Sequence, residues 1–407
     1  MIQRTEYLNW LQFWREKQVI KVLTGIRRSG KSTLFQLYME ELRKEGVAEE
    51  QMISINLEDL AYEELTDYKK LYQYVSERLC KDKWTYVFLD EIQQCKNFEK
   101  AVDSLFIKQN VDVYITGSNA YMLSGELATL LSGRYVELQI LPFSFVEYYE
   151  SIKNIELDTQ RAFQQYMMTG SFPYIAVLLG IDAKAGIEDY LSGIYHTVLI
   201  KDVAKREGIT DISILEDVIK CLASSIGSPV SIKKISDTIV SYGRKIATNT
   251  VDNYVRALMD SFLFYKVNRY DVRGKQHLKT LGKYYLVDTG LKGLLSSNKT
   301  GDIGHMLENI VFLELLRRKY QVSIGKIADV EIDFVATKGN EVCYIQVSNT
   351  VLDENTLKRE LTPLQKVKDN YPKILLTLDT IGAGNNYEGI KQINVIDWLL
   401  GKEKDVY

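Results

Sequence analysis

The stretch GIRRSGKST at residues 25–33 constrains the fold more than any other part of the sequence. It follows an apolar run that predicts a strand and precedes a helical pattern, the setting that a phosphate-binding loop requires. Glycines at 25 and 30 let the backbone curl so that successive N–H groups face phosphate oxygens, helped by the helix N-terminus. Lys31 then reaches the β- and γ-phosphates, and the Ser32 hydroxyl binds Mg²⁺. We expect a bound nucleotide to contact Gly25, Arg28, Ser29, Gly30, Lys31, Ser32 and Thr33.

Five apolar runs in the first ~150 residues predict the strands of a parallel sheet. The runs are continuous rather than alternating, as expected for strands that are covered on both faces. Helical patterns such as residues 32–44 and 98–109 lie between them, so the fold class is α/β with a P-loop NTPase sheet. The five runs are VIKVLTG (19–25), MISINL (52–57), TYVFLD (85–90), VDVYITG (111–117) and YVELQIL (135–141).

An acidic pair ends the third of these runs, in YVFLDEIQQC at residues 86–95. Asp90 emerges at the carboxyl end of a buried strand, where it can hold Mg²⁺ together with Ser32. Glu91 follows it and is placed to orient and deprotonate an attacking water. An exposed acid pair at a strand end is the structural alternative. Because the pair lies downstream of a P-loop with a strand between the two motifs, we expect Glu91 to be catalytic.

Two further positions are candidates for contact with the reacting phosphate. Ser118, with Asn119 beside it, ends the strand in VYITGSNAYML at residues 113–123, although a helix N-cap explains Ser118 equally well. Arg134 precedes the fifth strand and could neutralise transition-state charge in its own subunit or in a neighbour, with a surface salt bridge as the alternative. Glu58 and Asp59 end the second strand and could bind Mg²⁺, pair with an arginine or cap a helix.

Composition limits the other classes of function. The chain has 407 residues, enough for two to four domains, and a net charge of −3 argues against a surface that is basic throughout. The four cysteines form no CxxC pair, so we expect free thiols and no zinc site. The start of the chain shows no signal-peptide pattern, and no apolar run approaches the roughly 20 residues that a membrane-spanning helix needs. We therefore expect a cytoplasmic protein with no membrane partner.

These motifs together resemble a widespread family of prokaryotic AAA+-like ATPases that carry a carboxy-terminal domain of unknown function. The resemblance runs in order through nearly the whole chain, from VIKVLTGIRRSGKSTL and YVFLDEIQ to LSGRYVELQILPFSFVEY, IYHTVLIKDVAKREGI, KYYLVDTGL and ENIVFLELLRRKY. It implies ATP binding and hydrolysis by Gly30, Lys31, Ser32, Asp90 and Glu91, and it adds weight to Arg134. The chain departs mildly from the family at residues 170–173, where Gly-Ser-Phe-Pro replaces Gly-Gly-x-Pro.

The middle of the chain predicts a winged helix-turn-helix. Apolar residues recur at helical spacing over 212–225, 231–240 and 247–263, and two strands, LFYKV and KYYLVD, follow as a wing. The region from 265 to 283 holds six basic residues and one acid, an excess that could contact DNA phosphates. The third helix is poor in Arg and Lys, so a protein-binding module stays open. The six basic residues are Lys266, Arg269, Arg273, Lys275, Lys279 and Lys283.

The last ~100 residues are predicted to form a degenerate PD-(D/E)XK nuclease-like domain. Glu308 lies on the opening helix, Asp333 on a strand, and Gln346 and Ser348 on the next strand, where an active enzyme has a second acid and a lysine. Metal-assisted cleavage needs at least two carboxylates and a lysine, so we expect little or no nuclease activity. A lysine from elsewhere, such as Lys326 or Lys358, could restore the chemistry.

We therefore expect four parts: a P-loop ATPase core at 1–154, a helical connector at 155–205, a winged helix at 206–295 and the nuclease-like domain at 296–407. The expected activity is Mg²⁺-dependent ATP hydrolysis that is coupled to binding of DNA or a protein by the carboxy-terminal domains. The alternatives are a nucleotide-gated switch with slow turnover and an ATP-dependent nuclease. Oligomer formation is possible.

Overall fold

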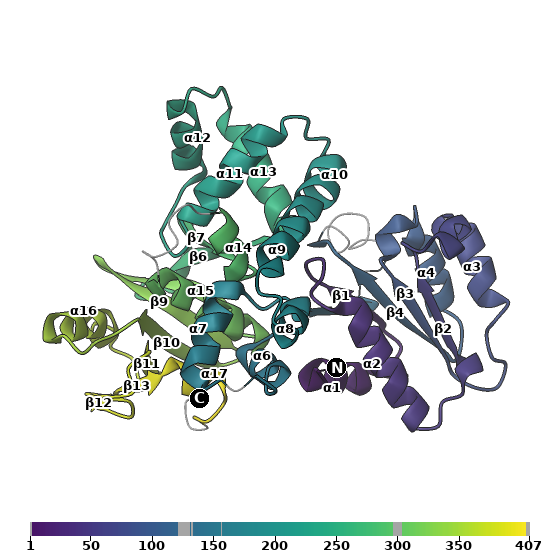
Figure 1. Cartoon of the computed structure of the whole chain (residues 1–407), viewed down its shortest axis with the longest axis horizontal. Coiled ribbons are helices and arrows are strands. Elements are labelled where there is room, and N and C mark those ends of the chain that lie inside the picture. Colours follow the sequence, from purple (N-terminus) through teal and green to yellow (C-terminus); the bar gives the residue numbers. More distant parts are fainter. Residues whose placement is uncertain (1, 121–130, 132, 156, 296–302, 404–407) are drawn as a thin grey trace. The chain divides into compact units, whose positions relative to one another are not determined.

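The structure is a computed structural model of the whole chain, and it describes residues 2–120, 131, 133–155, 157–295 and 303–403. The chain divides into two compact units (Figure 1). Unit 1 comprises Met1–Pro142 with Asp260–Phe262, and unit 2 comprises Phe143–Met259 with Leu263–Tyr407. In the described part of the chain, no helix has both the length and the apolar character needed to cross a membrane.

Unit 1 is built on a five-stranded parallel sheet, which confirms the α/β prediction. The strand order is β2-β3-β4-β1-β5, so β4 lies between the strand before the P-loop and the strand that ends in Asp90. All six residues of β3 are buried, as are all five of β1, which is why these strands read as unbroken apolar runs. The strands are β1 (Ile20–Thr24), β2 (Met52–Asn56), β3 (Thr85–Asp90), β4 (Val111–Gly117) and β5 (Tyr135–Gln139).

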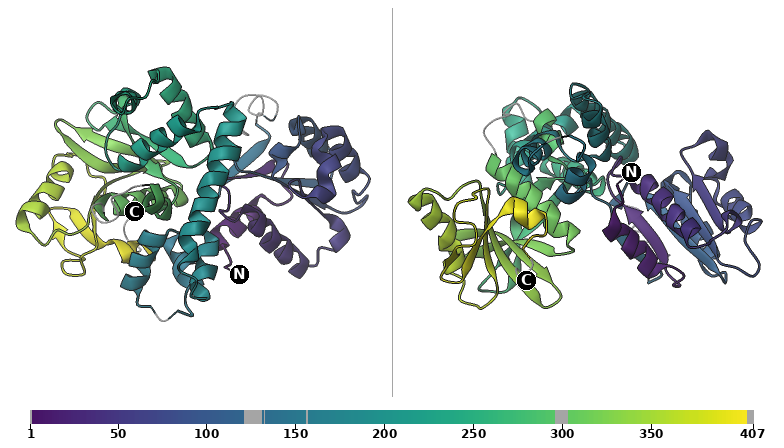
Figure 2. Two further views of the ribbon diagram at one scale, coloured as in Figure 1. Left: turned by 45° about the horizontal axis from the view of Figure 1, so that its top comes forward. Right: turned by 60° about the horizontal axis from the view of Figure 1, so that its bottom comes forward.

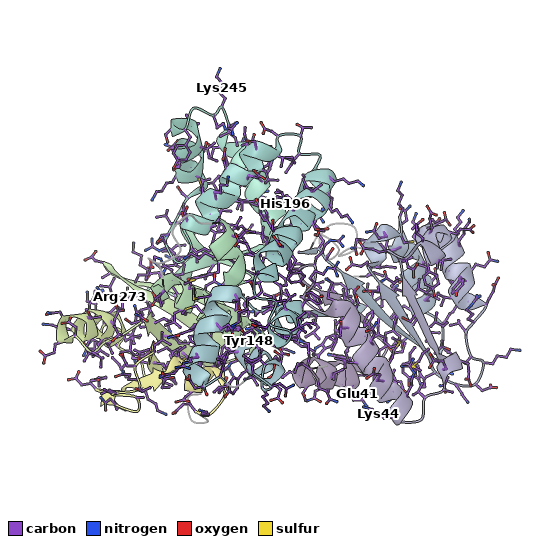
Figure 3. The ribbon with its side chains drawn as sticks, viewed as in Figure 1. Glu41, Lys44, Tyr148, His196, Lys245 and Arg273 are labelled. Atoms are coloured by element: carbon purple, nitrogen blue, oxygen red, sulfur yellow. The ribbon has the colours of Figure 1, made fainter. Side chains whose placement is uncertain are left out.

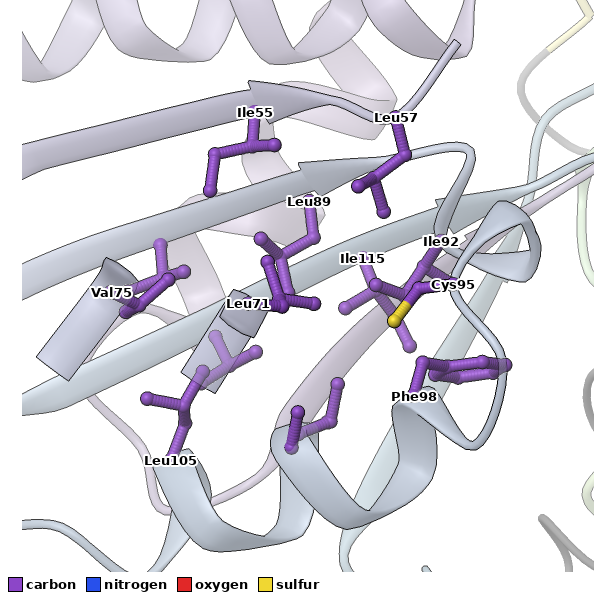
Figure 4. Close-up of a cluster of buried hydrophobic side chains, with 14 of the residues drawn as sticks. Ile55, Leu57, Leu71, Val75, Leu89, Ile92, Cys95, Phe98, Leu105 and Ile115 are labelled. Atoms are coloured by element: carbon purple, nitrogen blue, oxygen red, sulfur yellow. The ribbon is translucent and has the colours of Figure 1, made fainter. Parts of the chain in front are cut away.

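Helices cover both faces of this sheet. Leu71, Leu89 and Leu105 belong to a hydrophobic cluster on the face that carries α3 and α4 (Figure 4). A second cluster packs α1 and α2 on the other face through residues such as Leu11, Leu34 and Phe88. With both faces closed, the polar side chains gather at the carboxyl ends of the strands. The helical segments of unit 1 are α1 (Thr5–Trp14), α2 (Lys31–Lys44), η1 (Glu49–Gln51), η2 (Leu60–Thr66), α3 (Tyr68–Ser76), η3 (Ile92–Gln94) and α4 (Phe98–Phe106).

A group of helices begins unit 2, and a clamp around Asp288 fixes the turn between two of them. The Asp288 carboxylate accepts hydrogen bonds from the Ser171 N–H and hydroxyl, at 2.6 and 2.8 Å, and from the Gly290 N–H at 2.9 Å. Ser171, where the family resemblance predicts glycine, therefore contributes a bond of its own. These helices are α6 (Phe145–Ser151), α7 (Thr159–Thr169), α8 (Pro173–Gly180), α9 (Gly186–Thr197), the π-helical η5 (Val198–Ala204), α10 (Lys205–Glu207) and α14 (Thr289–Leu295).

The predicted helices and hairpin of the middle region are present, but the hairpin is part of a larger sheet. Helices α11 (Ile212–Ser224), α12 (Ile232–Ser241) and α13 (Thr248–Asp260) precede β6 (Phe264–Asp271) and β7 (Gln276–Leu286). In β6, Arg269–Asp271 pair with Ile324–Lys326 of the next strand, so the hairpin satisfies its backbone groups against the carboxy-terminal strands. The domain boundary predicted at residue 295 therefore separates strands that belong to one sheet.

This eight-stranded sheet has the order β12-β13-β11-β10-β9-β8-β6-β7. Figure 2 shows the green hairpin strands continuing into the yellow-green strands of the carboxy-terminal region. Helix α15 (Ile303–Arg317) contacts several of its strands, and α16 (Glu354–Gln365) and α17 (Val395–Leu399) pack near its other end. The remaining strands are β8 (Gln321–Ile327), β9 (Val330–Lys338), β10 (Glu341–Ser348), β11 (Lys373–Thr377), β12 (Asn386–Tyr387) and β13 (Ile390–Asn394).

Candidate phosphate site and carboxy-terminal cluster

The backbone of the GIRRSGKST loop follows a path that depends on its two glycines. Gly25 has φ 139° and Gly30 has φ 97°, both in the region that residues with a side chain rarely adopt. A Cβ on Gly25 would lie 2.2 Å from the Ile140 carbonyl oxygen, so the loop also packs tightly against the segment after β5. Arg28, with φ 66°, is the third residue of the loop with a positive φ, and its side chain is exposed. The loop thus has the compact form expected around a phosphate.

Helix α2 begins directly at Lys31, with Gly30 as its N-cap and no side chain capping it. The N–H groups of Lys31, Ser32 and Thr33 belong to the first turn, where amides have no partner within the helix. The Lys31 side chain is buried, and its Nζ donates to the carbonyl oxygens of Gly25 at 2.9 Å and Ile26 at 3.1 Å. Aligned amides and a buried ammonium group in one loop favour an anion with several oxygens.

Asp90 and Glu91 lie at the carboxyl end of β3, and both are largely buried. The Thr116 hydroxyl on β4 donates to Asp90 Oδ1 and accepts a hydrogen bond of 2.9 Å from the Glu91 N–H. Glu91 Oε1 lies 3.8 Å from Lys31 Nζ, which joins the acidic pair to the phosphate loop. The geometry brings these three charged residues together, and it argues against an exposed acid pair because neither carboxylate is at the surface.

Gln93 connects Glu91 to Ser118, a link that sequence reasoning did not predict. Its Nε2 donates to Glu91 Oε2 and lies 3.3 Å from Ser118 Oγ. Ser118 and Asn119 are both buried. The alternative in which Ser118 caps a helix involves residues 121–130, which lie outside the described residues. Gln93 and Thr116 had no motif to mark them, because their role depends on β3 and β4 being neighbours.

The residues of the second strand end have structural partners. Glu58 forms an ion pair with Arg27, in which Oε1 lies 2.9 Å from a guanidinium nitrogen. Asp59 caps η2 by accepting from the Ala61 N–H at 3.0 Å. Two of the three uses predicted for this acidic pair, arginine pairing and helix capping, therefore occur.

Arg134 lies at the opposite edge of the sheet from the phosphate loop. Its carbonyl oxygen accepts from the Ile20 N–H at 2.7 Å, at the amino end of β1, whereas the loop follows the carboxyl end. With ~3.3 Å per residue, five residues of β1 separate the two edges by about 17 Å. The guanidinium forms a half-exposed ion pair with Asp103. The salt bridge proposed as the alternative is thus present, and Arg134 does not reach the phosphate loop of its own chain.

Arg4, a residue that no motif marked, contacts the phosphate loop directly. Its guanidinium donates to the Ser29 carbonyl oxygen and to the Leu141 carbonyl oxygen, each at 2.8 Å. The side chain is buried, and its Cζ lies 4.5 Å from the centre of the Tyr7 ring. An arginine shortly before a helix gives no sequence signal for such a role.

In unit 2, the residues predicted for a nuclease-like site do come together, with Lys283 among them. Lys283 Nζ lies 2.9 Å from Glu308 Oε1, 2.9 Å from Glu331 Oε1 and 3.6 Å from Asp333 Oδ1. The Tyr285 hydroxyl also donates to Glu308 Oε1, at 2.6 Å. We call Lys283, Glu308, Glu331 and Asp333 the carboxy-terminal cluster. The lysine of the cluster comes from β7. Lys326 and Lys358 were the candidates predicted from the sequence for this place, and neither of them is the lysine found here.

The other two positions of the predicted nuclease-like site have bonds of a structural kind. Gln346 Oε1 accepts from the Asp333 N–H at 3.3 Å, and its Nε2 donates to Glu360 Oε2 at 2.9 Å. Ser348 Oγ donates to the Thr350 carbonyl oxygen at 3.1 Å. Among the described residues, no group of three or more His, Cys, Asp or Glu side chains has the arrangement of a metal site.

Electrostatics in the cluster follow from its burial. Burial, reinforced by the neighbouring Glu308 carboxylate, raises the pKa of Asp333 to about 8 against the opposing effect of Lys283. Burial by itself lowers the pKa of Lys283, but the carboxylates of Glu308, Asp333 and Glu331 outweigh it and the pKa is raised. Lys283 therefore stays charged within the cluster.

The same contacts change the interpretation of the basic hairpin. Of the six basic residues proposed to touch DNA, Lys283 is buried among carboxylates and Arg269 lies 3.4 Å from Glu331. Neither side chain can bind a DNA phosphate while those contacts persist. Three of the six remain exposed on the hairpin, and the side chain of Lys279 lies outside the described residues. The exposed three are Lys266, Arg273 and Lys275.

Comparisons with known proteins agree with unit 1 as a P-loop ATPase fold. Residues 17–149 match the model of an AAA domain, and residues 160–302 match a domain of unknown function (DUF8612). An uncharacterized protein of Haemophilus influenzae is 41% identical over 98% of this chain and 99% of its own length. The uncharacterized protein MJ1544 of Methanocaldococcus jannaschii is 30% identical over 93% of this chain and 85% of its own.

Among solved structures, the Walker-type ATPase PABY2304 of Pyrococcus abyssi superposes with a TM-score of 0.52. It is 16% identical, and the match covers 72% of this chain and 96% of that one. At this level of identity, the similarity shows the fold alone.

Proposed function

We propose that this chain, which belongs to the same family as the uncharacterized Haemophilus influenzae protein, is a Mg²⁺-dependent ATPase. The chain has an AAA-type ATPase-like fold. The observation that carries the proposal is the meeting of Lys31, Asp90 and Glu91 at the carboxyl end of β3, with Lys31 Nζ and Glu91 Oε1 3.8 Å apart. The order of the sheet supports it, because β4 separates the P-loop strand from the acidic strand and supplies Thr116 to both acids.

In the proposed mechanism, each residue at the phosphate loop and at the end of β3 has its own role. Amides of the first turn of α2 and the Lys31 ammonium bind the phosphates and neutralise charge that develops in the transition state. Ser32 and Asp90 are the residues that would hold Mg²⁺, which when bound offsets the negative charge of the β- and γ-phosphates. Glu91 accepts a proton from the attacking water as its oxygen bonds to the γ-phosphorus and the bond to the ADP oxygen breaks. Gln93 holds Glu91 near Ser118, which we assign to sensing the γ-phosphate.

Replacement of Glu91 by glutamine tests this assignment. Glu91→Gln keeps the size of the side chain and removes the proton acceptor, so we expect turnover to fall by about 100-fold or more while ATP still binds. The matched control is Glu77→Gln at the exposed end of α3. Steady-state phosphate release and fluorescent nucleotide titration measure the two effects. Native turnover in Glu91→Gln would contradict the mechanism.

We propose that Arg134, if it acts on the phosphate at all, acts on the site of a neighbouring subunit. Its place at the amino edge of the sheet separates it from the phosphate loop of its own chain. If it acts in a neighbour, a mixture of Arg134→Ala and Lys31→Ala chains regains turnover, because one composite site then has both residues. No recovery in the mixture, with both variants folded, would contradict this role.

A second proposal is that ATP hydrolysis is coupled to DNA binding through a winged helix. An isolated antiparallel bridge joins Val230, which lies between α11 and α12, to Gly282 of β7, and it supports the proposal because a winged helix has strand pairing at this point. The exposed side of α13 carries Asn249, Asn253 and Arg256, residue types that bind bases and phosphates, although Arg256 also forms an exposed ion pair with Asp252 at 2.6 Å. Lys245, in the turn before α13, points away from the rest of the structure (Figure 3).

Turnover with duplex DNA, single-stranded DNA, RNA or no addition distinguishes this coupling from the alternatives. Stimulation by one nucleic acid that Lys245→Ala reduces supports DNA coupling. Slow turnover that no nucleic acid changes would favour a switch that binds a protein partner.

A further inference from the structure

The Arg4 guanidinium lies between two parts of unit 1 that serve different purposes. One part is the phosphate loop, whose Ser29 carbonyl oxygen accepts from a terminal nitrogen of Arg4. The other is Leu141, one residue before Pro142, where unit 1 ends and the chain continues into unit 2. Both bonds are 2.8 Å long and both are assisted by the positive charge, which makes them stronger than neutral hydrogen bonds.

The segment that Arg4 holds also contacts the phosphate loop from its other side. The Ile140 N–H donates to the Thr24 carbonyl oxygen at 2.7 Å, and Gly25 has no room for a Cβ against the Ile140 oxygen. The Leu141 N–H donates to the Tyr7 hydroxyl at 3.4 Å, and the Tyr7 ring lies beneath the Arg4 guanidinium. The beginning of the chain, the phosphate loop and residues 140–141 therefore form one packed junction.

The bond to Ser29 has a direct consequence for phosphate binding. The Ser29 carbonyl and the Gly30 N–H belong to the same trans peptide group, so they point in opposite directions. A guanidinium that fixes the carbonyl therefore also fixes the direction of the N–H of Gly30, a residue that we expect to contact the nucleotide. Loss of the bond would let this peptide group rotate, and glycine at position 30 offers little resistance to that rotation.

We propose that Arg4 is a positioning residue that orients the Ser29–Gly30 peptide group for phosphate binding and transmits nucleotide occupancy to residues 140–142. This proposal rests on the proposed ATPase function. A rigid link between the loop and Leu141 means that a shift of the peptide group on nucleotide binding moves the segment through which the chain enters unit 2. Arg4 makes no contact with the reacting atoms in this scheme.

The test compares Arg4→Ala, Arg4→Gln and Arg4→Lys with the native chain and with Arg43→Ala. Arg43 pairs with Glu49 on the exposed surface of unit 1, so its removal is a matched loss of one arginine. We expect Arg4→Ala to weaken binding of a fluorescent ATP analogue by about tenfold, equivalent to about 1.4 kcal/mol. KM should rise more than kcat falls. Arg4→Lys, with one cationic donor group, should recover part of the affinity.

Hydrogen exchange of the peptide that spans residues 138–146 tests the second half of the proposal. A non-hydrolysable ATP analogue should slow exchange in this peptide in the native chain and in Arg43→Ala, and the effect should be lost in Arg4→Gln and Arg4→Ala. Affinity within twofold of native together with unchanged exchange in the Arg4 variants would overturn the inference. If the native chain itself neither binds nor hydrolyses ATP, the proposed function fails instead. If Arg4→Ala does not fold, Arg4→Gln and Arg4→Lys still decide.

Discussion

Each unit of this protein contains a buried lysine in contact with carboxylates, but the two lysines have different neighbours. Lys31 in unit 1 is 4% exposed, and its Nζ bonds to two backbone carbonyl oxygens, with the Glu91 carboxylate 3.8 Å away. Lys283 in unit 2 is 3% exposed and has carboxylate oxygens of Glu308 and Glu331 at 2.9 Å and of Asp333 at 3.6 Å. Carbonyl groups carry no net charge, whereas the carboxylates around Lys283 exceed its single positive charge.

The difference indicates what each site can bind. The Lys31 site adds helix amides to its ammonium group and so attracts a polyanion such as a triphosphate. In the carboxy-terminal cluster, Lys283 lies among the acids and compensates part of their charge. The cluster therefore has less attraction for a further cation than three acids without a lysine would have. Variants at Lys31, Lys283 and Asp333 test this contrast.

Lys31→Met should abolish ATP hydrolysis, with a loss of about a thousandfold, because the charge that stabilises the transition state is removed. Thermal stability should change little, since the side chain has neutral carbonyls as close partners. Phosphate release and differential scanning calorimetry measure the two effects. Full activity in this variant would show that the buried ammonium does not act on phosphate.

Lys283→Met should show the reverse pattern. Removal of a buried cation leaves the Glu308 and Glu331 carboxylates without compensation, a change that costs about 3–5 kcal/mol in comparable buried pairs. We expect a clearly lower melting temperature of unit 2 with nucleotide affinity retained. Adding Glu308→Gln to Lys283→Met should restore part of the stability, because one of the two uncompensated charges is removed; no recovery would contradict the electrostatic explanation.

The pH dependence of stability should reveal Asp333. Its pKa in the folded chain is raised to about 8 from an ordinary value of 3.8, so the stabilisation from its protonated form is complete below pH 4 and is lost as pH rises through 8. Between pH 7 and 9 this amounts to about 1.4 kcal/mol. The melting temperature of Asp333→Asn should therefore rise relative to native over this interval. Parallel curves would show that Asp333 titrates normally.

Nuclease activity should be absent, so no variant should differ from the native chain in a plasmid-cutting assay. Because Lys283 compensates the cluster and Gln346 and Ser348 have other partners, supercoiled plasmid should stay intact with Mg²⁺ or Mn²⁺ and ATP. Asp333→Ala should give the same result. Cutting by the native chain that Asp333→Ala abolishes would show that a metal can still displace the lysine.

The sheet of unit 1 could be predicted because its signal is local. The strands β1, β3 and β4 are short, mainly apolar runs covered on both faces, and they end at or next to polar residues that lie at one edge of the sheet. The hairpin β6–β7 was predicted as well, but its place was not. Its pairing with β8 depends on residues more than fifty positions later, and nothing in its own sequence distinguishes a wing from a strand of a larger sheet.

By itself, the sequence determined the phosphate loop and the acidic pair after β3, because contiguous residues specify a strand, a tight turn and a helix N-terminus. The tertiary structure decided which distant side chains join them: Arg4 and Thr116 in unit 1, and Lys283 in unit 2. Such meetings depend on the order and register of strands, which follow from the packing of the whole unit. A lysine before a β-strand end reads the same in the sequence whether it faces solvent or three carboxylates.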